Sequence, residues 1–279
     1  MKIAISCFCL LFVQLLTFAL FIFPHTWNIE ALNIFARYWY FWLSIMILTG
    51  TAIFFYKDHF FTTIRKLYEN PISLTKNLSK ILMIYLVIYF TFFVGLAYWK
   101  HINLSSAIFD LGTQEQVIWN TSHGRWFASS PEVTNYLGDH ISLILIPIAI
   151  IYRIFPYTIT LLSLQTLAVV LAIYGIYRLS IKKTKSRMTS FVIAVTFSTF
   201  WGISGLMLFD FHLISFALPI LIWGIYFLET EKNYIGMLLF LFAMITKEDV
   251  GIFIGSLGLY YIVTKRYKIG MLLTGVGYA

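Results

Sequence analysis

Apolar side chains occur along this chain in long continuous runs that are separated by short polar segments. Runs close to the roughly 20 residues that a membrane-crossing helix needs cover 3–23, 38–56, 78–99, 158–180, 188–209, 213–228, 234–246 and 250–264, and a ninth begins at Ile269. The last two complete runs are short, so their ends borrow flanking residues or face a protein-lined cavity. The pattern predicts an all-α, polytopic membrane protein with about eight or nine transmembrane helices in this chain.

Composition supports this fold class and excludes a soluble globule. Hydrophobic residues make up 60% of the 279 residues and charged residues only 11%, against about 25% charged in a typical soluble domain. The only cysteines, Cys7 and Cys9, lie together in the first apolar run, so the sequence contains no disulfide framework and no zinc-binding cysteine cluster.

The net charge is +8, and the positions of the charged residues along the chain predict its orientation in the membrane. With the N-terminus in the cytoplasm, most of the 20 lysines and arginines fall on the cytoplasmic side, including those in the basic segment 181–187. Most of the 12 acids fall on the exported side. We therefore expect a multi-pass protein of the cell membrane with the lipid bilayer as its partner. The basic segments act as topology determinants, and we expect no nucleic-acid binding.

This topology requires that the apolar stretch Ile141–Phe155 does not cross the membrane. The stretch contains Pro147 and Arg153 and ends at Pro156, which favours an interfacial or re-entrant helix. The alternative, in which it spans, would export the lysines of the segment 181–187.

We expect an N-terminal transmembrane hairpin with a cytoplasmic loop at 1–77, and a second membrane domain at 78–279 with a long exported loop at 100–157. The chain stops within an apolar run, which predicts a C-terminal truncation.

Ionisable residues gather on the predicted exported face, where each group interrupts or adjoins an apolar run. Such groups are costly near a membrane and usually face a cavity, pair with one another or mark a substrate path. Asp110 precedes a short predicted helix and serves either as its N-cap or as a functional acid. The candidate residues are Asp110, Arg125, Asp139, His140, Asp210, His212, Lys247, Glu248 and Asp249.

An ordered series of motifs in this region resembles a family of predicted membrane proteins catalogued as domain of unknown function 2079. The motifs lie between about residue 80 and residue 279. They are Phe109-Asp110-Leu-Gly-Thr-Gln-Glu-Gln-Val-Ile-Trp119-Asn120, Gly138-Asp-His140, Leu-Leu-Ser-Leu-Gln165, Asp210-Phe-His212 and Lys247-Glu-Asp249. By topology and motif placement that family is similar in turn to the GT-C superfamily of polytopic glycosyltransferases, which includes protein mannosyltransferases and lipid A aminoarabinose transferases.

The resemblance implies a GT-C-like fold and a glycosyltransferase that uses a polyprenyl-phosphate sugar donor and an unknown acceptor. Asp110 occupies the place of the essential acid in the first exported loop, where it would act as general base. Asp210 matches an acid of the second exported loop, and Lys247 falls beside the expected donor phosphate. Asp139, His140, His212, Glu248, Asp249 and Arg125 are the other candidates for substrate binding. The chain departs from most transferases in having Glu248-Asp249 after the lysine and a single acid at Asp110.

The chemistry requires a cation near the leaving phosphate, and we expect Lys247, Arg125 and Arg153 to be the only exported-side cations near the later motifs. A divalent metal held by Asp110, Asp210 and Glu248 with His140 or His212 would do the same work, and the sequence leaves both arrangements open.

Two other classes of function also remain open. A transporter or lipid flippase would place ionisable groups in a membrane cavity but usually shows internal repeats. The third hypothesis is a non-catalytic membrane scaffold.

Overall fold

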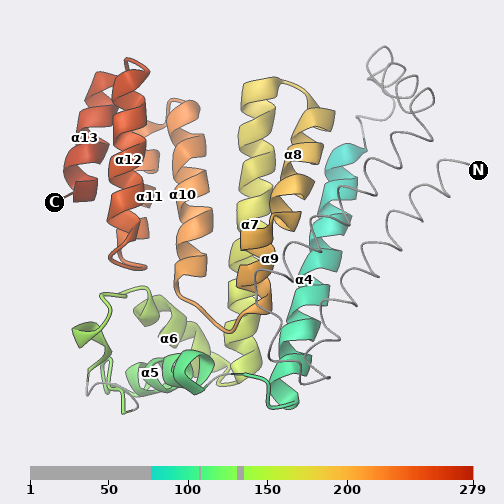
Figure 1. Ribbon diagram of the computed structural model, residues 1–279, viewed down its shortest axis with the longest axis vertical. Coiled ribbons are helices and arrows are strands. Elements are labelled where there is room, and N and C mark those ends of the chain that lie inside the picture. Colours follow the sequence, from blue (N-terminus) through green and yellow to red (C-terminus); the bar gives the residue numbers. More distant parts are fainter. Residues whose placement is uncertain (1–76, 107, 131–134, 279) are drawn as a thin grey trace, which may run out of the picture. The chain divides into compact units, whose positions relative to one another are not determined.

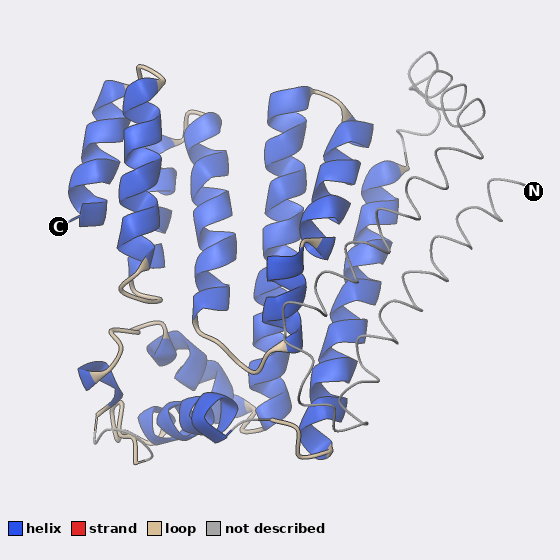
Figure 2. Cartoon of the chain, viewed as in Figure 1, coloured by secondary structure: helices blue, strands red, loops and turns tan. Residues whose placement is uncertain are grey.

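The computed structural model describes residues 77–106, 108–130 and 135–278, which belong to one compact unit, Thr75–Ala279. The predicted spans 3–23 and 38–56 lie outside the described residues, as do the two cysteines. Within these residues the fold consists of ten α-helices, with one π-helical and one 3-10 turn (Figures 1 and 2). The only strand-like pairing among them is an isolated bridge between Ala128 and Asn135. The all-helical prediction is confirmed.

Two helices are long and apolar enough to cross a membrane. Helix α4 covers Leu78–Ile102 and α7 covers Thr158–Thr184, with 25 and 27 residues. At about 1.5 Å per residue each exceeds the roughly 30 Å of bilayer hydrocarbon. Helix α7 begins two residues after Pro156 and ends at Thr184, and the next residue, Lys185, adopts the left-handed conformation. Both helices start where the apolar pattern predicts.

The predicted span 188–209 is divided into two helices. Helix α8 covers Arg187–Thr199, α9 covers Trp201–Leu208, and their axes are bent by 48°. Phe200 adopts an extended backbone between them and its ring folds over Gly202, where an added Cβ atom would lie 2.9 Å from the ring. If this bent pair counts as one span, the described residues contain three candidate spans.

The C-terminal part consists of four shorter apolar helices: α10 (Ile214–Glu229), α11 (Asn233–Met244), α12 (Val250–Val263) and α13 (Tyr267–Tyr278). Their positions match the predicted runs. At 12 to 16 residues they are shorter than a straight crossing helix. They share one hydrophobic core, in which Phe240, Ile254 and Leu273 are fully buried.

The long loop between α4 and α7 has its own structure. It contains a π-helical turn η2 (Ile108–Gly112), α5 (Thr113–Ser122), a 3-10 turn η3 (Tyr136–Gly138) and α6 (Leu145–Ile154). Helices α5 and α6 lie across one end of the long helices (Figure 1). The predicted non-spanning stretch corresponds to α6, which has only ten residues. We call this end of the helices the α5–α6 end.

Large apolar side chains remain exposed on the outer faces of the long helices. On α4, Ile84, Val87 and Ile88 point away from the protein core, whereas Leu82 and Leu86 are buried against α7 and α8. An apolar outer face is stable in lipid because hydrocarbon replaces the core that a soluble protein would need. The exposed face of α4 therefore has the apolar character that suits contact with lipid.

Candidate functional site

At the α5–α6 end, several of the candidate polar residues take part in contacts between segments that are far apart in the sequence. The last turn of α4 contacts the segment between α9 and α10, and the segment after η3 contacts the loop between α11 and α12. Phe211 and Leu213 of the first contact share a hydrophobic core with Ile144 and Leu145 of the second. The structure thus brings the predicted exported groups to one end of the helices.

Asp210 is the most buried of these acids and is paired with Lys100. The Nζ atom of Lys100 lies 2.9 Å from Asp210 Oδ1 and donates a second hydrogen bond to the carbonyl oxygen of Leu208, at 3.2 Å. The Asp210 side chain is 7% exposed and the Lys100 side chain 30%. An amine therefore compensates the charge of this carboxylate. The expectation that Lys247, Arg125 and Arg153 are the cations near the later motifs is incomplete, because Lys100 is also there.

Gln165 fixes the backbone on both sides of Asp210. Its Oε1 accepts from the backbone N–H of His212 at 2.6 Å, and its Nε2 donates to the carbonyl oxygens of Leu206 and Asp210, both at 3.3 Å. Gln165 is buried within α7. The His212 ring stacks on Phe209 with 4.7 Å between ring centroids. The motif Asp210-Phe-His212 is therefore held by a glutamine that belongs to another motif of the sequence.

Glu248 connects the α11–α12 loop to the segment after η3. Its carboxylate contacts His140 Nδ1 at 3.0 Å and accepts from the backbone N–H of Ile141 at 3.2 Å, while His140 Nε2 lies 3.6 Å from Asp139. Burial alone raises the pKa of Glu248, but hydrogen bonds from its own backbone N–H, His140 and Ile141 outweigh burial and lower that pKa. Three candidates therefore form one contact group.

Lys247 and Asp249 pair with each other beside this group. Lys247 Nζ lies 3.3 Å from Asp249 Oδ2, and both side chains are partly exposed. Arg125 lies in the loop after α5, where its guanidinium stands 4.9 Å from the centre of the Trp119 ring. No described contact joins Arg125 to the other candidate residues.

Asp110 lies within η2 and is partly exposed. The N-cap of α5 is Gly112, without a side-chain cap, and Asp110 forms no capping hydrogen bond. Among the described residues its carboxylate has no hydrogen-bond or ion-pair partner. Single π-helical turns are rare and occur frequently at functional sites. Of the two roles considered from the sequence, the structure disfavours the cap.

Glu115 is an acid at this end whose role the sequence does not reveal. Its carboxylate accepts hydrogen bonds from Tyr152 at 2.8 Å and from Thr158 at 2.8 and 2.9 Å. These bonds join α5, α6 and the start of α7. Burial and the adjacent carboxylate raise the pKa of Tyr152, so the phenol keeps its proton and remains a donor.

Within the described residues, no group of three histidine, cysteine, aspartate or glutamate side chains is placed to hold a metal ion. The structure shows instead that His140 and Glu248 contact each other and that Asp210 contacts Lys100, and no described contact joins Asp110 to either pair.

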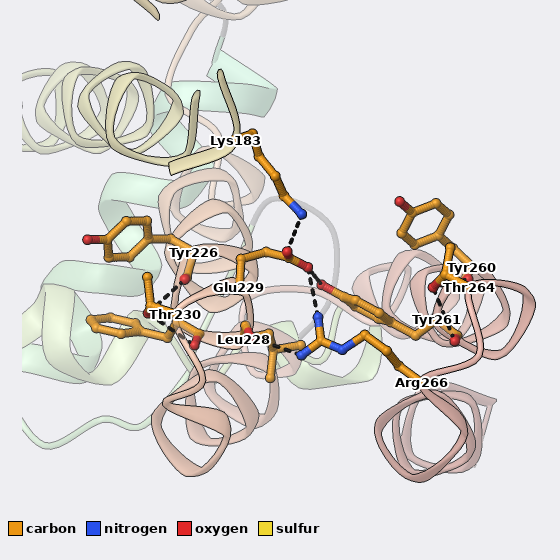
Figure 3. Close-up of polar contacts among 10 residues, drawn as sticks. Lys183, Tyr226, Leu228, Glu229, Thr230, Tyr260, Tyr261, Thr264 and Arg266 are labelled. Atoms are coloured by element: carbon orange, nitrogen blue, oxygen red, sulfur yellow. Dashed lines mark hydrogen bonds and ion pairs between the residues drawn. The ribbon is translucent and has the colours of Figure 1, made fainter. Parts of the chain in front are cut away.

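A second polar cluster, drawn in Figure 3, lies at the end of the helices opposite α5 and α6 (Figure 1). Glu229, at the end of α10, contacts Lys183 of α7, accepts from Tyr261 of α12 at 3.0 Å, and pairs with Arg266 at 2.9 Å. Arg266 also donates to the carbonyl oxygen of Leu228 at 2.9 Å. This Glu229 cluster joins the segments that end α7 and α10 with the α12–α13 turn.

Comparison with protein families places these features in a known group. A family model described as Predicted membrane protein (DUF2079) matches residues 100–279, well over half of the chain and including every candidate residue above. The chain belongs to the DUF2079 family. The DUF2079 resemblance expected from the motifs is confirmed, with a match that starts at residue 100 rather than near residue 80. No curated protein and no solved structure matches the chain. The chain is thus a membrane protein whose partner is the lipid bilayer.

Proposed function

We propose that this DUF2079 protein is a GT-C-type membrane glycosyltransferase that moves a sugar from a polyprenyl-phosphate donor to an acceptor at the exported face. The observation that carries the proposal is the contrast between Asp110 and its neighbours. Every other described acid at the α5–α6 end has a hydrogen-bonded or charged partner, whereas the partly exposed carboxylate of Asp110 has none among the described residues. Asp110 is the acid that remains available to a substrate.

In this reaction Asp110 acts as general base. Its carboxylate takes the proton of an acceptor hydroxyl while that oxygen attacks the anomeric carbon of the donor sugar. The bond between the anomeric carbon and the phosphate oxygen breaks, and its electron pair stays on the polyprenyl phosphate. Cations at the α5–α6 end, such as Lys247, stabilise the negative charge that develops on the leaving phosphate.

The proposed topology has eight or nine crossing helices, a cytoplasmic N-terminus and the α5–α6 end at the exported face. Helix α6 then lies at the membrane interface. Its buried residues Leu145 and Ile148 face the protein, while Ile150 and Ile154 are exposed and would contact lipid. This arrangement keeps a polar site next to the headgroups, where a lipid phosphate and a water-soluble acceptor can both reach it.

The test is transfer of a radiolabelled sugar from polyprenyl-phosphate hexoses and pentoses by membranes that contain the full chain. We expect Asp110→Asn to lower the rate by about 100-fold or more, because it removes the base but keeps the shape of the side chain. Glu231→Gln, an exposed glutamate at the opposite end, should retain the rate. Full activity of Asp110→Asn would refute the base assignment, and the absence of transfer from every donor would refute the proposed function.

A further inference from the structure

The pair of Lys100 and Asp210 combines a partly exposed amine with a buried acid. Lys100 lies in the last turn of a candidate span, and Asp210 lies in the segment before α10, 110 residues later. A lysine ammonium has three N–H donors. Among the described residues, Asp210 and the carbonyl oxygen of Leu208 accept two of them. One donor of Lys100 remains for a further acceptor.

The segment that contains Asp210 does not depend on Lys100 alone for its shape. Gln165 makes three hydrogen bonds to the backbone at Leu206, Asp210 and His212, and Phe211 is fully buried in the adjacent core. Gln165 and Phe211 therefore also hold the α9–α10 segment. The ion pair, for its part, joins the amine of Lys100 to this segment near the end of α4.

The position of Lys100 favours a role with an anionic ligand. In the proposed topology it lies on the exported side, against the usual retention of lysine in the cytoplasm. A buried acid fixes one side of the amine, so that little side-chain entropy is lost when an anion binds the other side. Lys247 differs, because its partner Asp249 is itself well exposed. Lys100 is thus the better oriented of these two cations.

We propose that Lys100 binds the phosphate group of a lipid-linked substrate at the exported headgroup level, and that Asp210 is the positioning residue that holds its amine. The inference rests on the proposed glycosyl transfer and deepens it by assigning the donor phosphate to a residue. The bound species is a phosphate oxyanion that accepts a charge-assisted hydrogen bond from Lys100 Nζ. Lys247 then serves as a second cation at the same end of the helices.

The experiment measures binding of farnesyl phosphate to the full chain in lipid nanodiscs, with farnesol and inorganic phosphate as comparison ligands. Lys100→Met should weaken binding of farnesyl phosphate by about tenfold or more, because it removes a charged donor. Lys100→Arg should retain most of the affinity. Lys232→Met, at the opposite end of the helices, is the matched control and should bind as the unchanged chain does.

A charge-reversed variant separates ligand binding from a purely structural ion pair. Lys100→Asp combined with Asp210→Lys restores an ion pair but moves the cation into the buried position. We expect this double variant to recover the melting temperature lost by Lys100→Asp alone, without recovering the binding of farnesyl phosphate. This design also covers the case in which a single variant fails to fold.

Several results would overturn the inference. Binding that survives Lys100→Met, or that returns in the charge-reversed variant, would remove Lys100 from the site and leave the proposed transfer standing. Equal binding of inorganic phosphate would identify free phosphate, not a lipid phosphate, as the ligand. If the unchanged chain binds farnesyl phosphate no better than farnesol, both this inference and the proposed donor fail.

Discussion

At the scale of single residues, the sequence predicts which polar groups gather but not how they pair. Asp210, His140 and Glu248 are recognisable because they interrupt apolar runs, and all three lie at the α5–α6 end. The sequence does not predict which residue pairs with Asp210. Lys100 stands at the end of an apolar run, where a lysine that extends toward the headgroups is ordinary. Only the packing of α4 beside the α9–α10 segment shows that its amine contacts an acid.

The Glu229 cluster gives a prediction at this scale. Glu229→Gln should lower the free energy of unfolding by about 1–3 kcal/mol, because it weakens charged hydrogen bonds from Tyr261 and Arg266 in a mostly buried position. The measurement is thermal unfolding in detergent. Glu231→Gln alters an exposed side chain nearby and should leave the melting temperature unchanged. Equal melting temperatures for the two variants would show that the cluster does not stabilise the fold.

At the scale of helices, the apolar pattern predicts the positions well and the lengths less well. Helix α7 begins at Thr158 as predicted, because Pro156 precedes it and an apolar run follows. The break between α8 and α9 escapes prediction, because no proline marks it. At the break the ring of Phe200 lies over Gly202, an arrangement that gives only a weak signal in the local sequence.

Helices α12 and α13 allow a prediction about packing. A Cβ atom added at Gly258 would lie 2.8 Å from the carbonyl oxygen of Gly270, so these two backbones touch and leave no room for a side chain. Gly258→Leu should therefore destabilise the protein by about 1–3 kcal/mol. Gly275→Leu, on an open part of α13, is the control. If Gly258→Leu lowers the melting temperature no more than Gly275→Leu does, this packing of α12 against α13 is contradicted.

At the scale of the whole described unit, contacts define two ends whose chemistry differs. The α5–α6 end carries the candidate acids and their partners, and the opposite end carries the Glu229 cluster together with Lys182, Lys185 and Lys265. The sequence alone predicts that these two sets of charged residues lie at opposite ends, because apolar runs alternate with polar loops along the chain. It does not reveal the contacts across each end, because these join segments that lie about 100 residues apart.

The sidedness of these ends gives the last prediction. Single cysteines at Asp110, His140, His212 and Lys247, in a chain without Cys7 and Cys9, should all react with a membrane-impermeant thiol reagent added to whole cells. Cysteines at Lys182 and Lys265 should react only after the membrane is permeabilised. Reaction of positions 110 and 247 from opposite sides would show that the proposed site cannot assemble.

The π-helical turn at Asp110 has a consequence for how the family can vary in sequence. A π turn holds one residue more than an α-helical turn. Loss of a single residue between Asp110 and α5 would therefore convert the π turn into an α-helical turn and change the local backbone that presents this carboxylate. For the proposed general base, the spacing between Asp110 and Thr113 therefore matters as well as the identity of the acid.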